Sequence, residues 1–433
     1  MVDQTITNIG KIVKEKKLLW ILWLFLFLRV NLDIFSNFVI FKFKKFPPVN
    51  FASLIGFFAV LLGVSLLLSL KFKFKKIPLF LPISIFLCFS FISVFYSIDK
   101  LTSLREFIRI LSIFSIYSLS FFLIKTKKAF KTLINVILIS SLIPVILGIY
   151  QYSFHKGMTS DISGFSNRIY GTFAHPNSFA IYLLIILSIL LFYFFYTRKL
   201  LFGVGVLFLS LLLCLTYSRI AWLGFILIIF IIGMLKYRKL LLTSLCILLL
   251  VYLIIPSVSL RINELFELDP YGSVVWRIKL WKDMTEVFKE KPIQGFGIGT
   301  FNVLTENIRG VKFGSTDAHN DYLKISVELG ILGLISYLFL IFNLLKILWQ
   351  RYIKGTSDKL IFLENSHKNK LLQEQKLFSL ILFALCVSVF AMAFADNLLK
   401  ATAIQWISWA LIGGFMGLAR ENPAPRLNPT PWL

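Results

Sequence analysis

Charged residues are scarce in this chain, and acidic residues are fewer than half as many as basic ones. Only 15% of the 433 residues are Asp, Glu, Lys or Arg, whereas 58% are hydrophobic and 16% are aromatic. A soluble globular domain has about a quarter of its residues charged. The composition therefore excludes an ordinary soluble domain and favours a helical protein that crosses a membrane several times.

Cysteine and histidine are also rare. The four cysteines all lie in hydrophobic runs without Cys-x-x-Cys spacing, which is typical of small buried side chains and not of disulfides. The four histidines are far apart, and none has the HxxxH or HExxH spacing of a metal site. We therefore expect no metal and no cofactor. The sequence also lacks a cleavable signal peptide and a convincing tandem repeat.

The shortage of acidic residues leaves a net charge of +25. The lysines, however, cluster beside hydrophobic runs, for example at 11–17, 71–76, 125–131 and 236–239. Basic residues beside spans set the orientation of a membrane protein against an anionic leaflet. Nucleic-acid binding is disfavoured, because no basic soluble domain is present to carry it.

The hydrophobic runs predict an all-α protein of about twelve transmembrane helices, with one large, mostly helical loop between helices 9 and 10. The predicted spans are 18–40, 50–70, 77–96, 103–124, 132–152, 177–196, 200–217, 220–236, 239–256, 320–349, 377–395 and 401–419. Spans one and four carry charges, and the roles of Arg105 and Arg109 in span four stay open.

Placing the N-terminus in the cytoplasm puts most lysine clusters inside, with 42–45 as the exception. This orientation divides the chain into a cytoplasmic N-terminus (1–17), nine helices (18–256), an outer loop domain (257–319), three helices (320–419) and a cytoplasmic tail (420–433). The loops at 153–176, 217–219 and 257–319 then emerge on one outer side. Polar residues in those loops are candidates for one shared site: Arg168, His175, Arg219, Arg277 and His319.

Within the outer loop, Ser273–Glu290 has the periodicity of an amphipathic helix. The predicted apolar face carries Val274, Ile278, Trp281, Met284 and Phe288. Arg277 lies within that face, and an inward-facing charge needs a partner or an anionic ligand. Two readings stay open: a buried pair with Glu264 or Asp317, or an anion site.

Arg219 and His319 are each placed at the end of a span. Arg219 sits in a tight hairpin between two spans, where it either snorkels to the interface or holds a phosphate. His319 opens span ten, with Thr316 or Asp317 available as an N-cap. The helix terminus favours a neutral, base-competent imidazole, although a capping role is the alternative.

Two glycine-containing loops mark turns and not nucleotide sites. Gly295–Phe301 contains Gly-x-Gly-x-Gly outside any βαβ context, so we expect a tight turn packed over the membrane spans. In Gly171–Asn177, Pro176 and Asn177 mark the start of span six, and we expect His175 to be structural.

These pieces together resemble the O-antigen ligase and polymerase superfamily of bacterial membrane glycosyltransferases. The matches are Ser218-Arg219 with Ala221-Trp222-Leu223, Arg277-Ile278-x-x-Trp281, Gly295–Phe301, His319-Asn320-x-Tyr322-Leu323 with Glu328-x-Gly330-x-x-Gly333, and Gly171-Thr172-Phe173-x-x-Pro176-Asn177. Their order agrees with the family over about residues 165–335. The twelve spans and the single large outer loop resemble the ligase branch.

The resemblance implies transfer of a glycan from undecaprenyl diphosphate to lipid A–core oligosaccharide, at the periplasmic face of the bacterial inner membrane. Arg219 and Arg277 would hold the diphosphate, and His319 would accept or orient the proton of the acceptor hydroxyl. Arg168, Asn320 and Tyr322 would add substrate contacts. The family further suggests a metal-independent, inverting enzyme that needs no nucleotide.

Three alternatives stay open. A polymerase would use a second lipid-linked glycan as acceptor, and Arg261 to Gly272 has the Arg-x10-Gly spacing often found in polymerase loops. A ligase that glycosylates proteins belongs to the same class. A transporter of lipid-linked glycans would instead predict inverted repeats, broken helices and ionisable residues near the middle of the bilayer.

Overall fold

The computed structural model describes residues 2–35, 38–41, 49–69, 77–159, 167–242, 273–309, 315–357 and 366–418, with isolated positions between 244 and 263. These residues are mostly helical, as the sequence predicts. A two-stranded antiparallel sheet, β1 (Val39–Phe41) with β2 (Val49–Asn50), is an addition to the all-α prediction.

Five described segments are helical and apolar enough to cross a membrane. They are α4 (Lys100–Leu123), α5 with α6 (Lys127–Ser140 and Leu142–Ser153), α7 (Pro176–Thr197), α14 (Asp321–Ser357) and α15 (Ser366–Met392). Five further helices contain shorter apolar stretches: α2 (Phe51–Ser69), α3 (Phe80–Tyr96), α8 (Leu200–Leu215), α9 (Arg219–Leu235) and α16 (Thr402–Leu418). The N-terminal helix α1 spans Val2–Asn31.

Several helix boundaries differ from the predicted spans. Helix α1 begins well before residue 18 and ends at Asn31, where a short 3-10 turn follows. Predicted span five is broken at Ser141, just before Pro144, whose ring cannot continue a helical hydrogen-bond ladder. Helix α14 is interrupted at Gly330, which has φ 68°. Most of predicted span nine (239–256) and the proposed tail (420–433) lie outside the described residues.

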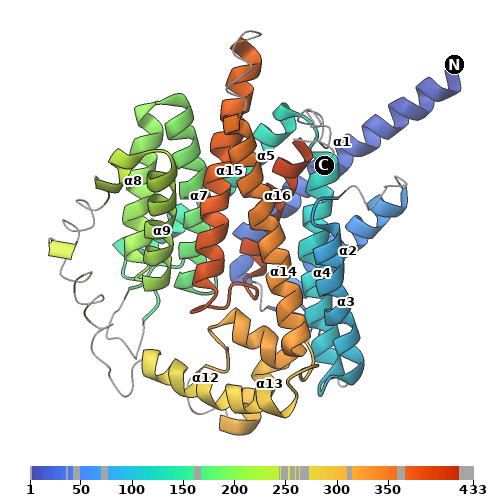
Figure 1. Cartoon of the computed structure of the whole chain (residues 1–433), viewed down its shortest axis with the longest axis vertical. Coiled ribbons are helices and arrows are strands. Elements are labelled where there is room, and N and C mark those ends of the chain that lie inside the picture. Colours follow the sequence, from blue (N-terminus) through green and yellow to red (C-terminus); the bar gives the residue numbers. More distant parts are fainter. Residues whose placement is uncertain are drawn as a thin grey trace, which may run out of the picture.

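The helices pack into one bundle (Figure 1). Helix α4 lies along α16, α14 packs against α15 and α3, and α7 contacts α8, α9 and α15. Fifteen of the 22 residues of α7 are buried, because the helix is hydrophobic on all sides and other helices surround it. Helix α8 instead exposes a leucine-rich face, which suits contact with lipid.

At one end of the bundle lie α12 (Ser273–Glu290) and α13 (Phe301–Arg309), below the other helices in Figure 1. We call this the loop end. The predicted amphipathic helix is confirmed with its boundaries, but its buried face is rotated: Leu280, Met284 and Val287 are buried, whereas Ile278 is 54% exposed. The three buried residues of α12 form a small hydrophobic core, separate from that of the bundle, with Phe296, Phe301, Leu304, Ala318 and Val327.

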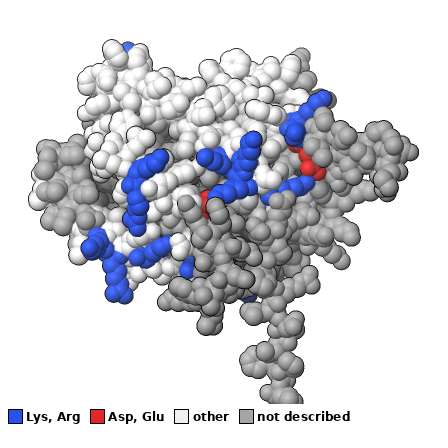
Figure 2. All heavy atoms as spheres, turned by 90° about the horizontal axis from the view of Figure 1, so that it is seen from above, with Lys and Arg blue, Asp and Glu red and all other residues white. Residues whose placement is uncertain are grey.

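At the opposite end of the bundle, most of the charged side chains that Figure 2 shows are basic. Helices α5 and α8 begin here, and α7 and α9 end here, beside the lysine clusters at 125–131, 197–199 and 236–239. We call this the basic end. The loop end carries acidic side chains as well, among them Asp283 and Glu290 of α12, so the two ends differ in charge.

Candidate functional site

Arg168 is fixed at the loop end although it belongs to no helix. Its backbone exchanges two hydrogen bonds with Met158, at 2.8 and 3.0 Å. Its side chain is only 8% exposed. The guanidinium donates from Nε to the carbonyl oxygen of Thr216 at 3.0 Å and from Nη2 to Oδ1 of Asn177 at 3.1 Å. Both of these acceptors are neutral groups.

Asn177 joins Arg168 to an acidic residue on a distant segment. Its amide nitrogen donates to Oδ2 of Asp396 at 2.9 Å. Asn177 lies in the first turn of α7, and Asp396 lies in the short connection between α15 and α16. One amide side chain therefore bridges a cation and a carboxylate that are 228 residues apart in the sequence (396 − 168).

His319 faces Asp396. The imidazole Nδ1 is buried and lies 3.5 Å from Oδ1 of Asp396, which is within the range of an ion pair, but it makes no hydrogen bond to a described residue. His319 has φ 46°, a left-handed conformation that costs a non-glycine residue on the order of 1 kcal/mol. Its backbone N–H donates to Oδ1 of Asn397 at 2.8 Å, which holds this conformation. The same short connection thus fixes the backbone of His319 and places a carboxylate near its ring.

The Asp396 carboxylate is kept ionised. Burial raises the pKa of Asp396, but the interactions with His319, the backbone N–H of Asn397 and the Arg277 guanidinium together lower it below its usual range. A carboxylate at Nδ1 selects the tautomer in which Nε2 is free to accept a proton, and it stabilises the imidazolium that forms. The pair therefore has the arrangement of a general base with its orienting acid.

Arg277 reaches the same connection from α12. Its Nη1 donates to the carbonyl oxygen of Ala395 at 3.0 Å, next to Asp396 in the chain. The neighbouring Trp276 places its ring edge-on to His319, with the ring centroids 6.0 Å apart. Of the two acids suggested as partners of Arg277, Asp317 pairs with Lys400 at 2.6 Å and Glu264 lies outside the described residues.

Arg219 lies at the same end of the bundle, in the turn between α8 and α9. It is the first residue of α9, is half-buried, and follows Ser218. The same turn provides the Thr216 carbonyl that accepts from Arg168. Arg219 is thus three residues from an atom that Arg168 contacts, at the loop end of the bundle.

His175 lies beside these groups as the N-cap of α7, where its Nδ1 accepts from the backbone N–H of Asn177 at 3.1 Å. Part of the ring is open to the surface, yet the crowded surroundings remove much of its hydration. This loss lowers the pKa of His175 to about 4, and Arg168 acts in the same direction. His175 is thus a neutral donor through Nε2 near neutral pH, in the structural position expected.

Asn320 and Tyr322 make contacts within the protein. Helix α14 begins at Asp321, and Asn320 caps it by accepting from the N–H groups of Tyr322 and Leu323, both at 3.0 Å. His319 therefore precedes the helix, and Asn320 takes the capping role expected of Thr316 or Asp317. The Tyr322 hydroxyl donates to the carbonyl oxygen of Phe390 at 2.7 Å.

The Gly295–Phe301 loop packs tightly against the bundle, as expected. The N–H of Gly297 donates to the Glu328 carbonyl at 2.8 Å, and the N–H of Phe301 donates to Oε1 of the same residue at 3.1 Å. Gly297 has φ 108°, and a side chain there would collide with Ser97. The glycines therefore allow close approach to helices α3, α4 and α14.

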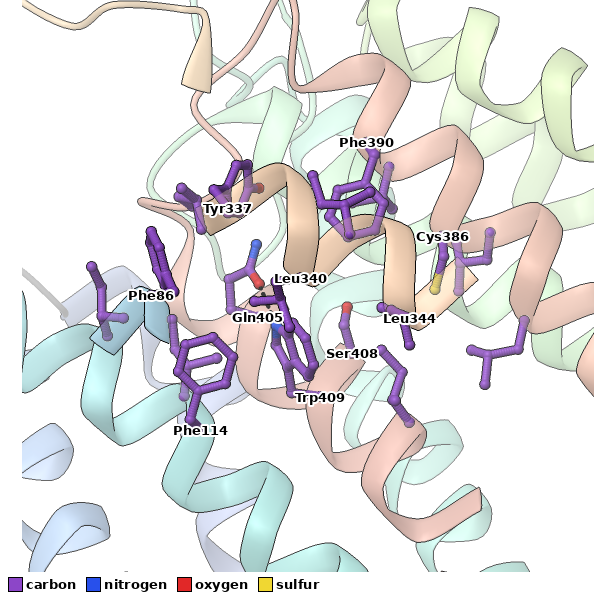
Figure 3. A pocket seen from close by; sticks show the side chains of 18 residues that line it. Phe86, Phe114, Tyr337, Leu340, Leu344, Cys386, Phe390, Gln405, Ser408 and Trp409 are labelled. Carbon is purple, nitrogen blue, oxygen red and sulfur yellow. Dashed lines mark hydrogen bonds between the residues drawn. The ribbon is translucent and has the colours of Figure 1, made fainter. Parts of the chain in front are cut away.

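Deeper in the bundle, an apolar cavity of about 40 Å³ lies among α3, α4, α14, α15 and α16 (Figure 3). Aromatic side chains such as Phe86, Phe114 and Trp409 line it, and Gln405 accepts a hydrogen bond from the Trp409 indole at 3.0 Å. The cavity is too small for a sugar or a diphosphate, and its lining carries no charged group. The polar arrangement around His319 is therefore the better candidate site.

The structure brings together Arg168, Arg277 and His319 around Asp396, a residue that the sequence analysis did not select. We call Arg168, Arg219, Arg277, His319 and Asp396 the arginine–histidine site. Asp396 could have been noticed as the sole acid in a short connection between two spans, on the same predicted side as the other candidates. The role of Asn177 as a bridge had no comparable indication.

The comparisons with known proteins agree with the resemblance found in the sequence. Residues 204–338 match the family model described as O-antigen ligase. The match contains Arg219, Arg277 and His319, together with α12, α13 and the Gly295–Phe301 loop. It covers about a third of the chain, and no curated protein matches the sequence.

Proposed function

We propose that this chain, whose residues 204–338 match the O-antigen ligase family, is a membrane glycosyltransferase that moves an O-antigen glycan from undecaprenyl diphosphate to lipid A–core oligosaccharide. One observation carries the proposal. Arg168, Arg277 and His319 come from three separate segments and meet around Asp396. A cationic cluster beside an oriented imidazole suits an anionic leaving group and a hydroxyl acceptor.

The arginines would act on the leaving group. When the bond between the anomeric carbon and the phosphate oxygen breaks, the bonding electrons go to the diphosphate and its negative charge increases. Guanidinium groups held in place by backbone carbonyls stabilise that charge without reorganising during the reaction. Arg168 and Arg277 are held in this way, and Arg219 would add a third cation.

His319 would act on the acceptor. The acceptor oxygen attacks the anomeric carbon, and its proton passes to Nε2 of His319 while Asp396 stabilises the imidazolium. The displacement is in line and inverts the anomeric centre. Asn320 and Tyr322 would contribute indirectly, because they hold the start of α14 next to His319.

The difference in charge between the two ends supports one orientation of the protein in the membrane. The basic end would face the cytoplasm, together with both termini, and the loop end would face the periplasm. Figure 2 shows several lysines and arginines on the basic end and few acidic side chains among them. In a bacterial inner membrane the proposed site would then lie on the periplasmic face, where lipid-linked glycans are transferred.

Transport is the alternative of another class. Two predicted spans are broken, at Ser141 and at Gly330, as a transporter would predict. However, the buried charged residues of α4 and α14 lie in the first three turns of each helix, at the loop end and not at mid-bilayer. The transferase is therefore the better supported function.

The test is an acceptor-choice assay. Purified protein is incubated with a polyisoprenyl-diphosphate glycan and either lipid A–core or no added acceptor. We expect transfer only to the core. Chain lengthening without core would instead identify a polymerase, whose Arg261-x10-Gly272 spacing lies outside the described residues. Transfer to neither, together with movement of the intact donor across vesicles, would identify a transporter.

A further inference from the structure

The connection between α15 and α16 carries Asp396 and is held from two sides. On the side of the arginine–histidine site, Asn397 accepts from the His319 backbone and Ala395 accepts from Arg277. On the bundle side, the backbone N–H and the backbone carbonyl of Leu399 both form hydrogen bonds. Its N–H donates to Oδ2 of Asp321 at 2.8 Å, and its carbonyl accepts from Nη1 of Arg109 at 2.5 Å.

The two side chains that bind Leu399 belong to a set of five charges, of which Glu106 and Arg109 are half-buried and the other three are buried. Arg109 forms a bidentate pair with Glu106, at 2.8 and 2.7 Å. Lys324 pairs with Glu328 at 2.7 Å and approaches Glu106 at 3.5 Å. We call Glu106, Arg109, Asp321, Lys324 and Glu328 the buried charge cluster. It links α4 to α14, and both helices to the connection that carries Asp396.

Helix packing alone does not account for these charges. Apolar side chains of similar size often hold helices together as well as a buried ion pair, or better. Asp321 is fully buried, and its Oδ1 has no hydrogen-bond partner among the described residues. Among those residues, the Asp321 side chain accepts one hydrogen bond, from the backbone N–H of Leu399. Burying a carboxylate costs free energy, and here it fixes that single N–H group.

Leu399 is three residues from Asp396, and Leu398 between them is also held, because its carbonyl accepts from Nε2 of Gln405 at 2.9 Å. Fixing Leu399 therefore restricts where Asp396 can lie. A shift of the connection would lengthen the contact of Asp396 with His319, which is already 3.5 Å. The position of the orienting acid thus depends on groups that do not touch the site.

We propose that Arg109 and Asp321 are positioning residues, which fix Leu399 and so hold Asp396 against His319. The role rests on the proposed function of His319 as the base. Neither residue contacts the substrates. Each acts through the connection between α15 and α16, and the ion pair with Glu106 keeps Arg109 in place.

The test is a double-mutant cycle on kcat for glycan transfer by the full-length protein. Asp321→Ala should lower kcat on the order of 30-fold, less than the roughly 100-fold that a 1 Å misplacement can cost, with KM for the donor little changed. Asp321→Asn should restore most of the rate, because the amide oxygen still accepts from Leu399. In an Asp396→Ala background, Asp321→Ala should cost less than about twofold more.

The matched pair Arg109→Met/Glu106→Gln should behave like Asp321→Ala. Its control is Arg29→Met/Asp33→Asn, which removes another buried ion pair that does not contact the connection. Additive losses in the cycle would overturn the proposal, as would equal losses in the control.

Hydrogen exchange measured by mass spectrometry provides a readout that does not depend on turnover. Asp321→Ala and Arg109→Met/Glu106→Gln should speed exchange in peptides covering 393–401 by at least about tenfold, while the control pair leaves these peptides unchanged. Unchanged exchange in the first two variants would overturn the proposal. Inactive wild-type protein with the expected exchange would instead overturn the proposed function and leave the fixing of Leu399 intact.

Discussion

The arginine–histidine site and the buried charge cluster lie close together at the loop end, yet the hydrogen bonds that hold their cations differ in kind. In the cluster, Arg109 and Lys324 each pair with a carboxylate inside the bundle. In the site, Arg168 and Arg277 donate to neutral carbonyl and amide groups. Charge pairs enclosed in a bundle hold structure, whereas guanidinium groups fixed by carbonyl and amide oxygens beside His319 are positioned to meet an anionic ligand.

The largest difference should appear when a site arginine is removed. Arg277→Ala should lower glycan transfer by about 1000-fold, because it deletes a fixed donor to the leaving diphosphate. The protein should still elute as a single species in detergent. Arg309→Ala is the matched control, since Arg309 lies in the same loop domain and pairs with Asp283. Equal losses in both variants would contradict the assignment.

Removing a residue of the buried charge cluster should mainly lower stability, whereas removing a site arginine should mainly lower activity. Glu328→Ala should lower the free energy of unfolding by about 3 kcal/mol, because it leaves Lys324 buried without its closest partner. Glu286→Ala, which breaks a largely exposed pair with Lys289, should change stability by less than about 0.5 kcal/mol. Unfolding in denaturant measures both. A stable Glu328→Ala protein would show that the cluster does not hold structure.

Asp396 belongs to the site but touches no proposed substrate, so its removal should have a smaller effect. Asp396→Asn should lower kcat on the order of 100-fold, since the amide no longer stabilises the imidazolium. Asp317→Asn, which alters a carboxylate that pairs with Lys400 on the same end, should retain activity within about threefold. Full activity of Asp396→Asn would remove Asp396 from the mechanism.

The smallest expected effect is a pH dependence of stability. The pKa of His175 falls to about 4 on folding, so between roughly pH 6.5 and 4 the unfolded state binds a proton that the folded state does not. Stability should therefore decline as pH falls through this window. Asp396, whose pKa is also lowered, should extend the decline below about pH 4. His175→Asn keeps an N-capping side chain, and its melting temperature should depend less on pH. An unchanged slope would contradict the assigned protonation.

Helix positions could be predicted from the sequence better than the contacts between distant segments. Amphipathic periodicity predicted α12 with its residue boundaries, and proline with asparagine predicted the start of α7, because local patterns decide both. The buried face of α12 was less predictable, since the loop domain builds a separate core with Phe296 and Phe301. Ile278 is left exposed as a result.

The candidate site was predicted only in part for a related reason. Arg277 and His319 stand out as polar residues at span ends, but Asp396 enters through a tertiary contact with α7 and the start of α14. Nothing in the local sequence of Ala395–Asn397 indicates such a contact. The buried charges of α4 and α14 were visible as charges within spans, but their pairing depends on how those helices pack.

The arginine–histidine site, as proposed above, binds a lipid-linked diphosphate. The most direct measurement is the equilibrium binding of undecaprenyl diphosphate to purified wild-type, Arg277→Ala and Arg309→Ala proteins. Because each charge-assisted contact contributes about 1.5–3 kcal/mol, Kd should rise at least tenfold in Arg277→Ala and stay unchanged in Arg309→Ala. Equal affinity of the wild-type and Arg277→Ala proteins would contradict it.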